Sequence, residues 1–377
     1  AMVGAGSAAL TSIRLGQGNK AEAEHILGNV VLLNSIIGLV MMVVSILFLD
    51  PILYFFGASP DTIGYARDFM QIILAGSVVT HMYLGLNEVL RASGYPKKAM
   101  MIMLTAVVVN CTLNPLFIFV FGWGIRGSAL ATIIAQSTAL AISLTHFSQR
   151  SSFLRFKHGI FRLRRKIVAS ILSIGAAPFL LHLCASVVVI FINMALKNNG
   201  GDLYIGAYGV VNRVVLLFVM IVAGLNQGMQ PIVGYNYGAK QYSRVKEVFW
   251  MTAKLGTIVT CICFIIGMFF PRVAVGIFTH DEALMEMASH GLRILVIGFP
   301  IVGFQMIGTN FFQCLGMVKK SVILSLSRQI LFLLPLLYAL PLWHGASGVW
   351  MSFPVSDILS AALTAILLRR LFKKFNR

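Results

Sequence analysis

The sequence predicts an all-α, polytopic membrane protein with two parallel-repeat six-helix lobes, the first of which lacks its first helix. Of the 377 residues, 58% are hydrophobic and 11% are charged, whereas about 25% of a soluble domain is charged. Apolar runs long enough to cross a bilayer as helices recur along the whole chain. Short motifs also repeat in the two halves, which indicates an internal duplication.

Eleven hydrophobic segments are the predicted membrane helices. Each is interpreted as a helix because a lone strand would leave its backbone groups without partners in lipid. They group into an N-lobe over 1–147, a basic cytoplasmic linker over 148–166, and a C-lobe over 167–377 that ends in a basic cytoplasmic tail. The segments are 1–13, 26–49, 69–90, 99–121, 128–147, 167–194, 203–233, 250–271, 291–314, 321–342 and 347–368.

The formal charge of +18 is concentrated in the connectors on one side of the membrane. Most Lys and Arg residues fall in every second connector, and a dense group lies in the linker 148–166. This asymmetry follows the positive-inside rule, so these connectors and the C-terminus are predicted to be cytoplasmic. A charge spread over membrane loops argues against nucleic-acid binding. It favours contact between the linker and anionic membrane lipids.

Catalytic and metal-binding patterns are absent from the sequence, so the chain is predicted not to be an enzyme. No Walker A, HExxH or GxSxG motif occurs, which disfavours ATP-driven pumping and hydrolase chemistry. A membrane-embedded enzyme would need clustered catalytic side chains, and the intramembrane Asp357 and His182 are far apart in the sequence. The cysteines all fall within predicted helices, as is typical of packing residues; they are Cys111, Cys184, Cys261, Cys263 and Cys314.

Small basic turns recur at corresponding places in the two halves. Gly94 in "SGYPKK" of the first half corresponds to Gly316 in "LGMVKK" of the second. Gly18 in "GQGNKAEA" is paired with Gly238 in "NYGAKQYS", at nearly the same offset along the chain. Because the second half has an even number of predicted helices, both halves have the same orientation and the repeats are parallel. The first half shows one segment fewer, so we expect one whole helix and the outer part of the next to precede Ala1.

Two acidic residues lie within the predicted helices, where ionisable side chains are rare and are candidates for function. Glu88 lies near a helix end, three residues before Arg91, so an interfacial ion pair explains it. Asp357 lies in the middle of 347–368, and no residue three or four positions away can neutralise it. Arg328 comes from a similar depth. Two interpretations therefore stay open, a structural Asp–Arg pair or a site for a proton or a substrate.

Further polar side chains in the predicted helices are candidates for a transport path. His182 is either a packing histidine or a proton-exchanging group, because histidine is the side chain that titrates near neutral pH. Asn110 and Asn114 are four residues apart, so they share one helix face. Two sets of amides either line a cavity or hold neighbouring helices together. They are Asn226, Gln227 and Gln230, and Gln305, Asn310 and Gln313.

Six stretches of sequence carry a family resemblance. They are "RLGQGNKAEA", "LRASGYPKKAM" and "NCTLNPLFIF" in the first half, and "GLNQGMQPIVGYNYGAKQ", "FFQCLGMVKKS" and "GVWMSFPVSD" in the second. Together they resemble the MATE (multidrug and toxic compound extrusion) transporters, most of all the bacterial branch with DinF-like and MepA-like efflux proteins. The resemblance covers the whole chain. It implies two six-helix lobes, a central cavity and cation-coupled antiport.

The resemblance also implies roles for particular residues. Asn110, Asn114 and Thr132 match positions of a cation site in the family, although the family usually has Asp where this chain has Asn114. A further acid is expected on the missing first helix. Asp357 lies in "PVSD", which matches a pattern of the family's last helix and so favours a functional role.

The sequence therefore predicts a secondary antiporter of the bacterial inner membrane that works by alternating access. It would act as a monomer and export amphipathic, often cationic, organic compounds in exchange for Na⁺ or H⁺, with no other cofactor. The alternative is a flippase for lipids or lipid-linked oligosaccharides of the same superfamily. Such flippases often have a more basic cavity, and the clearly intramembrane basic residues here are Arg213 and Arg328.

Overall fold

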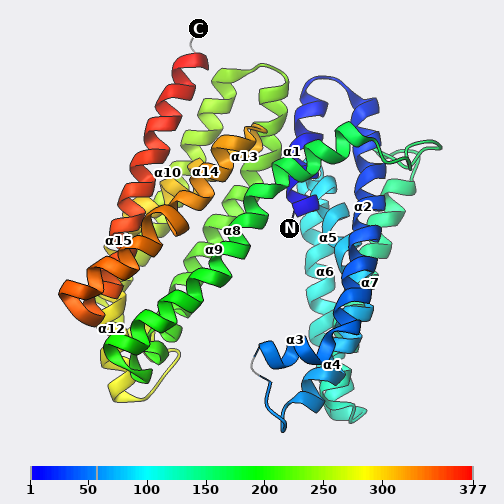
Figure 1. The fold of residues 1–377 in the computed structure, drawn as a ribbon. Coiled ribbons are helices and arrows are strands. Elements are labelled where there is room, and N and C mark those ends of the chain that lie inside the picture. Colours follow the sequence, from blue (N-terminus) through cyan, green and yellow to red (C-terminus); the bar gives the residue numbers. More distant parts are fainter. Residues whose placement is uncertain (1, 57, 376–377) are drawn as a thin grey trace. The chain divides into compact units, whose positions relative to one another are not determined.

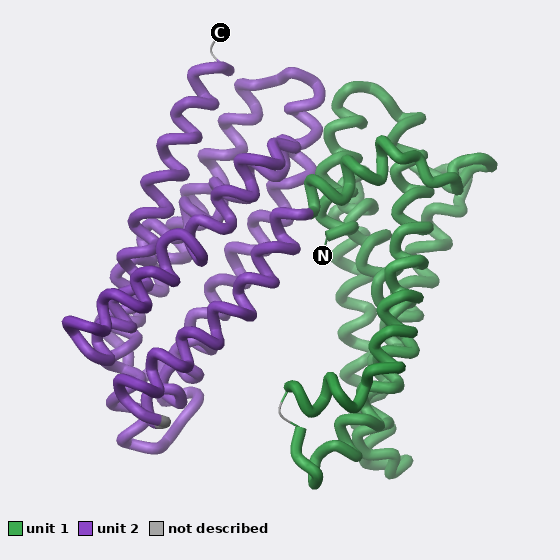
Figure 2. Tube along the Cα trace, in the orientation of Figure 1, with its two compact units in different colours: residues 1–175 green, residues 176–377 purple. Residues whose placement is uncertain are grey.

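The computed structural model describes residues 2–56 and 58–375, and these residues are almost entirely helical (Figure 1). The chain divides into two compact units, residues 1–175 and 176–377 (Figure 2). Unit 1 contains α1 (Met2–Gly16), α2 (Lys20–Leu47), α3 (Leu49–Phe55), α4 (Ile63–Ala75), α5 (Ser77–Ala92), α6 (Pro96–Pro115), the π-helical turn η1 (Leu116–Val120), α7 (Gly124–Ser148) and the first turns of α8 (Arg165–Gly200).

Unit 2 contains the rest of α8 and all later elements. They are α9 (Asp202–Gly238), α10 (Tyr242–Phe269), α11 (Pro271–Gly276), α12 (Glu282–Val296), α13 (Phe299–Cys314), α14 (Val318–Leu326), the π-helical turn η2 (Ser327–Leu333) and α15 (Leu334–Phe375). α15 is two helical arms joined at a kink, where Gly345 has φ 55° and ψ −139°. That backbone conformation is almost restricted to glycine.

The helices confirm the predicted polytopic all-α fold. Among the described residues, seven helices are long and apolar enough to cross a membrane, or nine if each of two bent pairs counts as one span. The predicted segments 69–90 and 291–314 are each covered by two helices with a bend between them. Each is a bent pair, α4 with α5 at 52° and α12 with α13 at 59°. A bend at a glycine leaves the hydropathy of the segment unchanged, so the sequence pattern does not reveal it.

The order of elements repeats between the units at a constant offset, in agreement with the predicted duplication. The helices α10, α11 and α14 begin at one and the same offset from α2, α3 and α6, respectively. Gly76 at the first bend and Gly298 at the second are separated by this offset as well. The short helices α3 and α11 were not predicted, yet they occupy equivalent places in the two units.

Backbone conformations in the turns correct one detail of the repeat. Gly94 and Gly316 both have positive φ, 97° and 68°, as their predicted pairing requires. In the other turn, the residues with positive φ are Gly18 (74°) and Lys240 (58°). Lys240, rather than Gly238, is therefore the equivalent of Gly18, and this pair has the same offset as Gly94 and Gly316. A non-glycine residue in the left-handed conformation costs roughly 1–2 kcal/mol. The sequence comparison therefore paired glycine with glycine, whereas the second turn has a lysine at the position equivalent to Gly18.

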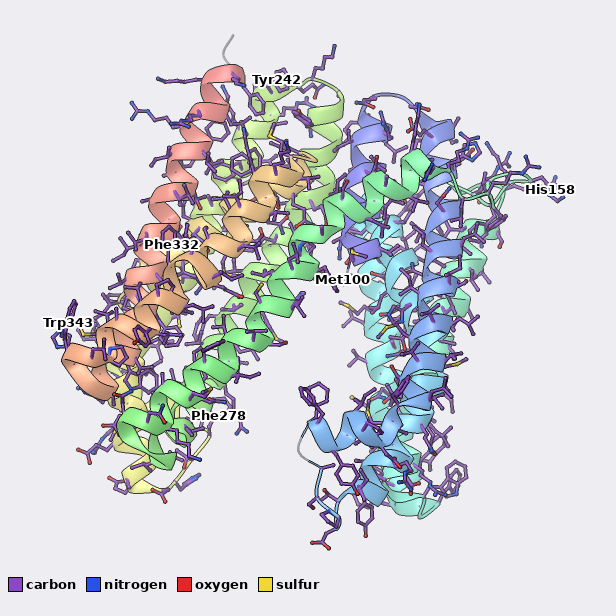
Figure 3. The ribbon with its side chains drawn as sticks, in the orientation of Figure 1. Met100, His158, Tyr242, Phe278, Phe332 and Trp343 are labelled. Atoms are coloured by element: carbon purple, nitrogen blue, oxygen red, sulfur yellow. The ribbon has the colours of Figure 1, made fainter. Side chains whose placement is uncertain are left out.

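The predicted linker 148–166 is folded onto the start of α2 in unit 1. Lys157 Nζ forms an ion pair with Glu24 at 2.6 Å. The Asn29 side chain, which is fully buried, donates to one backbone carbonyl of the loop at 3.1 Å and accepts from one backbone N–H at 2.9 Å. His158 lies on the outward side of this loop in Figure 3. The inner side of the loop is thus fixed by hydrogen bonds and charge, while its outer side is exposed.

Unit 2 is built around two hydrophobic clusters. One surrounds Trp350, which is fully buried against Gly291. The other is rich in phenylalanine and includes Phe249 and Phe311, whose ring centroids are 4.7 Å apart. Many large apolar side chains also cover the outside of both units, as expected where lipid replaces water as the solvent. Trp343 in Figure 3 is one of them.

Candidate functional site

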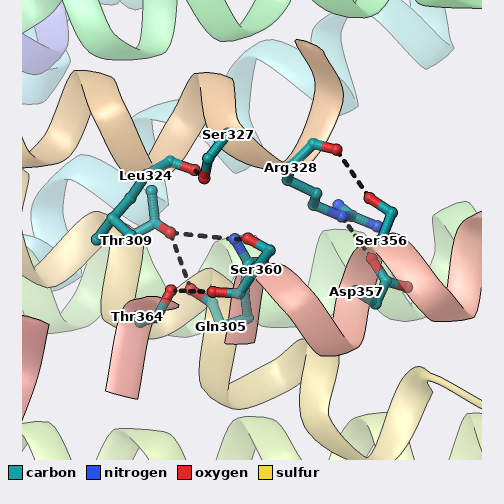
Figure 4. Close-up of polar contacts among 9 residues, drawn as sticks. All are labelled: Gln305, Thr309, Leu324, Ser327, Arg328, Ser356, Asp357, Ser360 and Thr364. Atoms are coloured by element: carbon teal, nitrogen blue, oxygen red, sulfur yellow. Dashed lines mark hydrogen bonds and ion pairs between the residues drawn. The ribbon is translucent and has the colours of Figure 1, made fainter. Parts of the chain in front are cut away.

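An ion pair between Arg328 and Asp357 lies inside unit 2 (Figure 4). The Arg328 Nε–H donates to Asp357 Oδ1 at 2.6 Å. The Asp357 side chain is 3% exposed, whereas that of Arg328 is 32% exposed. The structure therefore brings together the two residues that the sequence placed at a similar depth. The carboxylate is enclosed by protein, and the guanidinium group is in reach of the surface of the unit.

Arg328 lies in the π-helical turn η2 and contacts α15 at two points. A π turn inserts an extra residue into the helical hydrogen-bond ladder, and such turns are frequent at functional sites. The Arg328 carbonyl accepts a hydrogen bond from the Ser356 hydroxyl at 2.8 Å. Arg328 is thus joined to neighbouring residues of α15 twice, once through its side chain to Asp357 and once through its backbone to Ser356. The sequence alone did not indicate the second contact.

A second polar group continues along the same face of α15 (Figure 4). The Gln305 amide on α13 donates to Thr309 Oγ1 at 3.2 Å and to Ser360 Oγ at 3.1 Å. The Thr364 hydroxyl in turn donates to the Ser360 carbonyl at 2.8 Å. Asp357, Ser360 and Thr364 are three and four residues apart, so they form one stripe on the helix. Of the candidate amides, Gln305 therefore joins α13 to the stripe that bears Asp357.

The other members of this candidate set are placed differently. Asn310 Oδ1 accepts a hydrogen bond from the Cys314 thiol, one turn along α13. Gln313 is buried near the end of the same helix. On α9, Asn226 and Gln230 are buried whereas Gln227 is exposed. Burial of Gln230 favours a role in helix packing, whereas Asn226 Oδ1 is buried and has no hydrogen-bond partner among the described residues, so a ligand role for Asn226 stays open. Exposure at Gln227 favours contact with a solute or with lipid.

His182 lies on an exposed face of α8. Its backbone carbonyl accepts from the Ser186 hydroxyl one turn later. The imidazole is therefore not enclosed by the described residues, and contact with a solute or with lipid stays open. The second predicted ion pair, between Glu88 and Arg91 at the end of α5, is confirmed.

The candidate cation ligands of unit 1 lie on α6 and α7. The Asn110 amide donates to Thr132 Oγ1 at 3.1 Å, and the Thr132 hydroxyl donates to the Ser128 carbonyl at 3.0 Å. Asn114 Oδ1 is buried and has no hydrogen-bond partner among the described residues. A buried oxygen without a donor is a suitable ligand for a hard cation such as Na⁺. The oxygens contributed by this set are all uncharged, however.

Two neighbouring residues were missed by the sequence reasoning. Gln136 lies one helical turn after Thr132 on α7, and its side-chain oxygen accepts from the Thr80 hydroxyl of α5 at 2.5 Å. The spacing of four residues from Thr132 was the available signal, since it places both side chains on one face. Together with Asn110, Asn114 and Thr132, these residues form a polar strip in unit 1 with members on α5, α6 and α7. No group of three or more His, Cys, Asp or Glu side chains that could hold a metal ion occurs among the described residues.

Comparison with known proteins identifies relatives over most of the chain. The MatE family model matches residues 1–116 and 178–339. The multidrug export protein MepA of Staphylococcus aureus (strain bovine RF122 / ET3-1) is 25% identical over 332 residues, which are 88% of this chain and 73% of that protein.

Solved structures agree with this assignment. The MATE multidrug transporter DinF-BH, determined in complex with R6G, is 36% identical, with a TM-score of 0.88 over 98% of this chain and 83% of that chain. A MOP superfamily transporter from Pyrococcus furiosus has the same fold, with a TM-score of 0.93 over 100% of this chain and 84% of that chain at 22% identity.

Proposed function

The chain belongs to the MatE family, and from this premise we propose that it is a secondary antiporter that exports amphipathic organic compounds, cationic ones included, in exchange for Na⁺ or H⁺. Members of this family are transporters and not enzymes, and this chain is a multi-pass membrane protein of a multidrug efflux family. The coupling ion is the only cofactor in the proposal. The protein would act as a monomer in the bacterial plasma membrane, with its C-terminus in the cytoplasm.

The Arg328–Asp357 pair is the observation that carries the coupling part of the proposal. Arginine stays protonated at any pH a cell experiences. If Asp357 took up a proton, the guanidinium group would lose its counter-charge inside a membrane protein, which is costly. Protonation of Asp357 would therefore favour movement of Arg328 toward water or toward another anion. Its 32% exposure leaves room for such a movement. A proton would in this way change the charge that unit 2 presents.

Sodium coupling would instead use the polar strip of unit 1. Asn114 Oδ1 is already free to accept a cation, and the Asn110 and Thr132 oxygens lie on the same strip. Uncharged ligands leave the charge of a bound Na⁺ uncompensated in a low dielectric, so this site would bind weakly without a carboxylate nearby. The H⁺ route would therefore use a pair of charged side chains in unit 2, whereas the Na⁺ route would use uncharged ligands in unit 1.

Transport driven by imposed gradients tests the proposal. The full chain would be reconstituted in liposomes that contain a fluorescent amphipathic cation, and its release would be followed after a Na⁺ gradient or a pH gradient is applied. The proposal expects gradient-dependent release that protein-free liposomes do not show. Release that ignores both gradients, or none at all from correctly inserted protein, would contradict antiport.

The alternative function, a flippase for lipids or lipid-linked oligosaccharides, is favoured by one observation. Arg213 lies within α9 and is exposed, although it is ten residues inside the predicted segment 203–233. An exposed cation at that depth must meet water or an anionic group rather than lipid tails. The same liposomes would decide this question if they carried a fluorescent lipid with an anionic headgroup. Exchange of that lipid between leaflets, without release of the organic cation, would favour the flippase.

A further inference from the structure

A shallow groove lies on the surface of unit 2 between α10 and α13. Its walls are apolar except for one ammonium group and one hydroxyl group. The lining residues are Trp250, Ala253, Lys254, Thr257, Ile258 and Phe304. None of these residues belongs to the polar stripe around Asp357 or to the strip in unit 1.

The groove follows from the way the two helices cross. Five of the lining residues are spaced three or four positions apart along α10, so they form one face of that helix. The crossing is close because Gly256 and Gly303 face each other. A Cβ atom on Gly303 would lie 2.5 Å from the Gly256 carbonyl oxygen. Beside this contact, Phe304 of α13 is stacked on Trp250 of α10 and forms the opposite wall of the groove.

Lys254 gives the groove its chemical character. It is exposed, and none of the described carboxylates forms an ion pair with it. It lies four residues inside the predicted segment 250–271, which is about 6 Å at the rise of an α-helix. A lysine side chain at that depth extends toward the headgroups while its methylene groups stay in apolar surroundings. Trp250, one turn nearer the basic end of α10, is typical of the same interfacial layer.

We propose that this groove binds an anionic phospholipid of the surrounding membrane. One acyl chain lies along Thr257, Ile258 and Phe304, and the headgroup phosphate contacts the Lys254 ammonium group. The solvent at this face of a membrane-spanning helix is lipid, so an acyl chain is available to cover the apolar walls. A lone cation at headgroup level selects an anionic lipid over a zwitterionic one, because the latter carries its own positive charge. The site is separate from the residues of the proposed antiport.

Lipid binding to purified protein tests the assignment. The full chain in detergent would be titrated with phosphatidylglycerol or with phosphatidylcholine of the same acyl chains, and bound lipid would be measured by native mass spectrometry. We expect Lys254→Gln to weaken phosphatidylglycerol binding about fivefold, the factor that matches about 1 kcal/mol of attraction for one lysine. Phosphatidylcholine binding should be unchanged. Lys254→Arg should keep the preference.

Two further variants make the result specific. Arg244→Gln removes an exposed cation from the same helix outside the groove, and it should leave both lipids unaffected. Thr257→Phe fills the groove and should weaken both lipids while Lys254 is intact. Equal binding of both lipids by the unaltered chain would overturn the proposal, as would unchanged phosphatidylglycerol binding in Lys254→Gln. Competition by water-soluble glycerol phosphate would also contradict it, because the acyl chain would then be unnecessary.

Discussion

At the scale of single residues, the Arg328–Asp357 pair is unequal in burial, and this has a consequence for stability. Arg328→Gln would leave the Asp357 carboxylate, on a side chain that is 3% exposed, without its cation, whereas Asp357→Asn would leave the Arg328 guanidinium group on a side chain that is 32% exposed. Removing one partner of a buried pair typically costs about 3–5 kcal/mol. We expect a loss in this range for Arg328→Gln and a smaller loss for Asp357→Asn, measured as unfolding in detergent by circular dichroism.

The double variant Arg328→Gln/Asp357→Asn is the control for this prediction. It removes both charges, so it should be more stable than Arg328→Gln alone. Additive losses in the double variant would mean that the two side chains do not interact in the folded protein.

A charge added at Asn114 should strengthen Na⁺ binding. Asn114→Asp places a carboxylate where a buried amide oxygen now lacks a partner, beside Asn110 and Thr132. We expect the dissociation constant for Na⁺, measured by isothermal titration calorimetry, to fall about tenfold, which corresponds to about 1.4 kcal/mol. Adding Thr132→Val should reverse part of this gain. An unchanged affinity for Na⁺ in Asn114→Asp would remove these residues from the cation site.

The contact between Arg328 and Asp357 could be anticipated because depth in a membrane can be counted along a helix. The hydrogen bond from Ser356 to the Arg328 carbonyl could not, since Arg328 lies in a π turn, and neither the turn nor a backbone acceptor leaves a mark in the hydropathy pattern. Gln136 could have been found from its spacing to Thr132, whereas its partner Thr80 lies on a helix whose neighbours the sequence does not reveal.

At the scale of elements, the loop between α7 and α8 is fixed to α2 chiefly through Asn29, whose side chain makes two hydrogen bonds to the loop backbone. Asn29→Ala would remove both hydrogen bonds to the loop backbone, at a cost of roughly 0.5–1.5 kcal/mol each. We expect trypsin to cleave the loop, for example after Lys157, faster in Asn29→Ala than in the unaltered protein.

Asn199→Ala is the matched control for the loop experiment, because Asn199 is an exposed asparagine of α8 in unit 2. It should leave the cleavage rate in the loop unchanged. Equal cleavage rates in Asn29→Ala and the unaltered chain would mean that other contacts, such as the ion pair of Lys157 with Glu24, suffice to hold the loop.

The positions of most long helices could be predicted because apolar runs of this length have one stable arrangement in a bilayer. The bends could not, because Gly76 and Gly298 change the direction of a helix without changing its polarity. The docking of the linker was also hidden. Its basic composition predicts an exposed loop, and the one buried asparagine that fixes it lies far earlier in the chain, on α2.

At the scale of the whole molecule, the two units contain equivalent elements at a constant offset along the chain, as the repeated motifs predicted. Their polar residues are not equivalent. Unit 1 has an uncharged strip around Asn114, whereas unit 2 has the buried charge pair around Asp357. Duplication therefore preserved the scaffold, while the chemistry of each unit diverged. This asymmetry is the basis of the two alternative coupling routes proposed here, H⁺ through unit 2 or Na⁺ through unit 1.

Efflux by Asp357→Asn in liposomes, with His182→Gln as the comparison, tests whether Asp357 couples transport to the proton gradient. If Asp357 couples transport to the proton gradient, the asparagine variant should lose about tenfold or more in rate under a pH gradient, equal to about 1.4 kcal/mol or more. His182→Gln should lose far less, because His182 is exposed on α8 and Asp357 is paired with Arg328 instead. Normal transport by correctly folded Asp357→Asn under both pH and Na⁺ gradients would contradict a coupling role for Asp357 and leave the ion pair with a structural role.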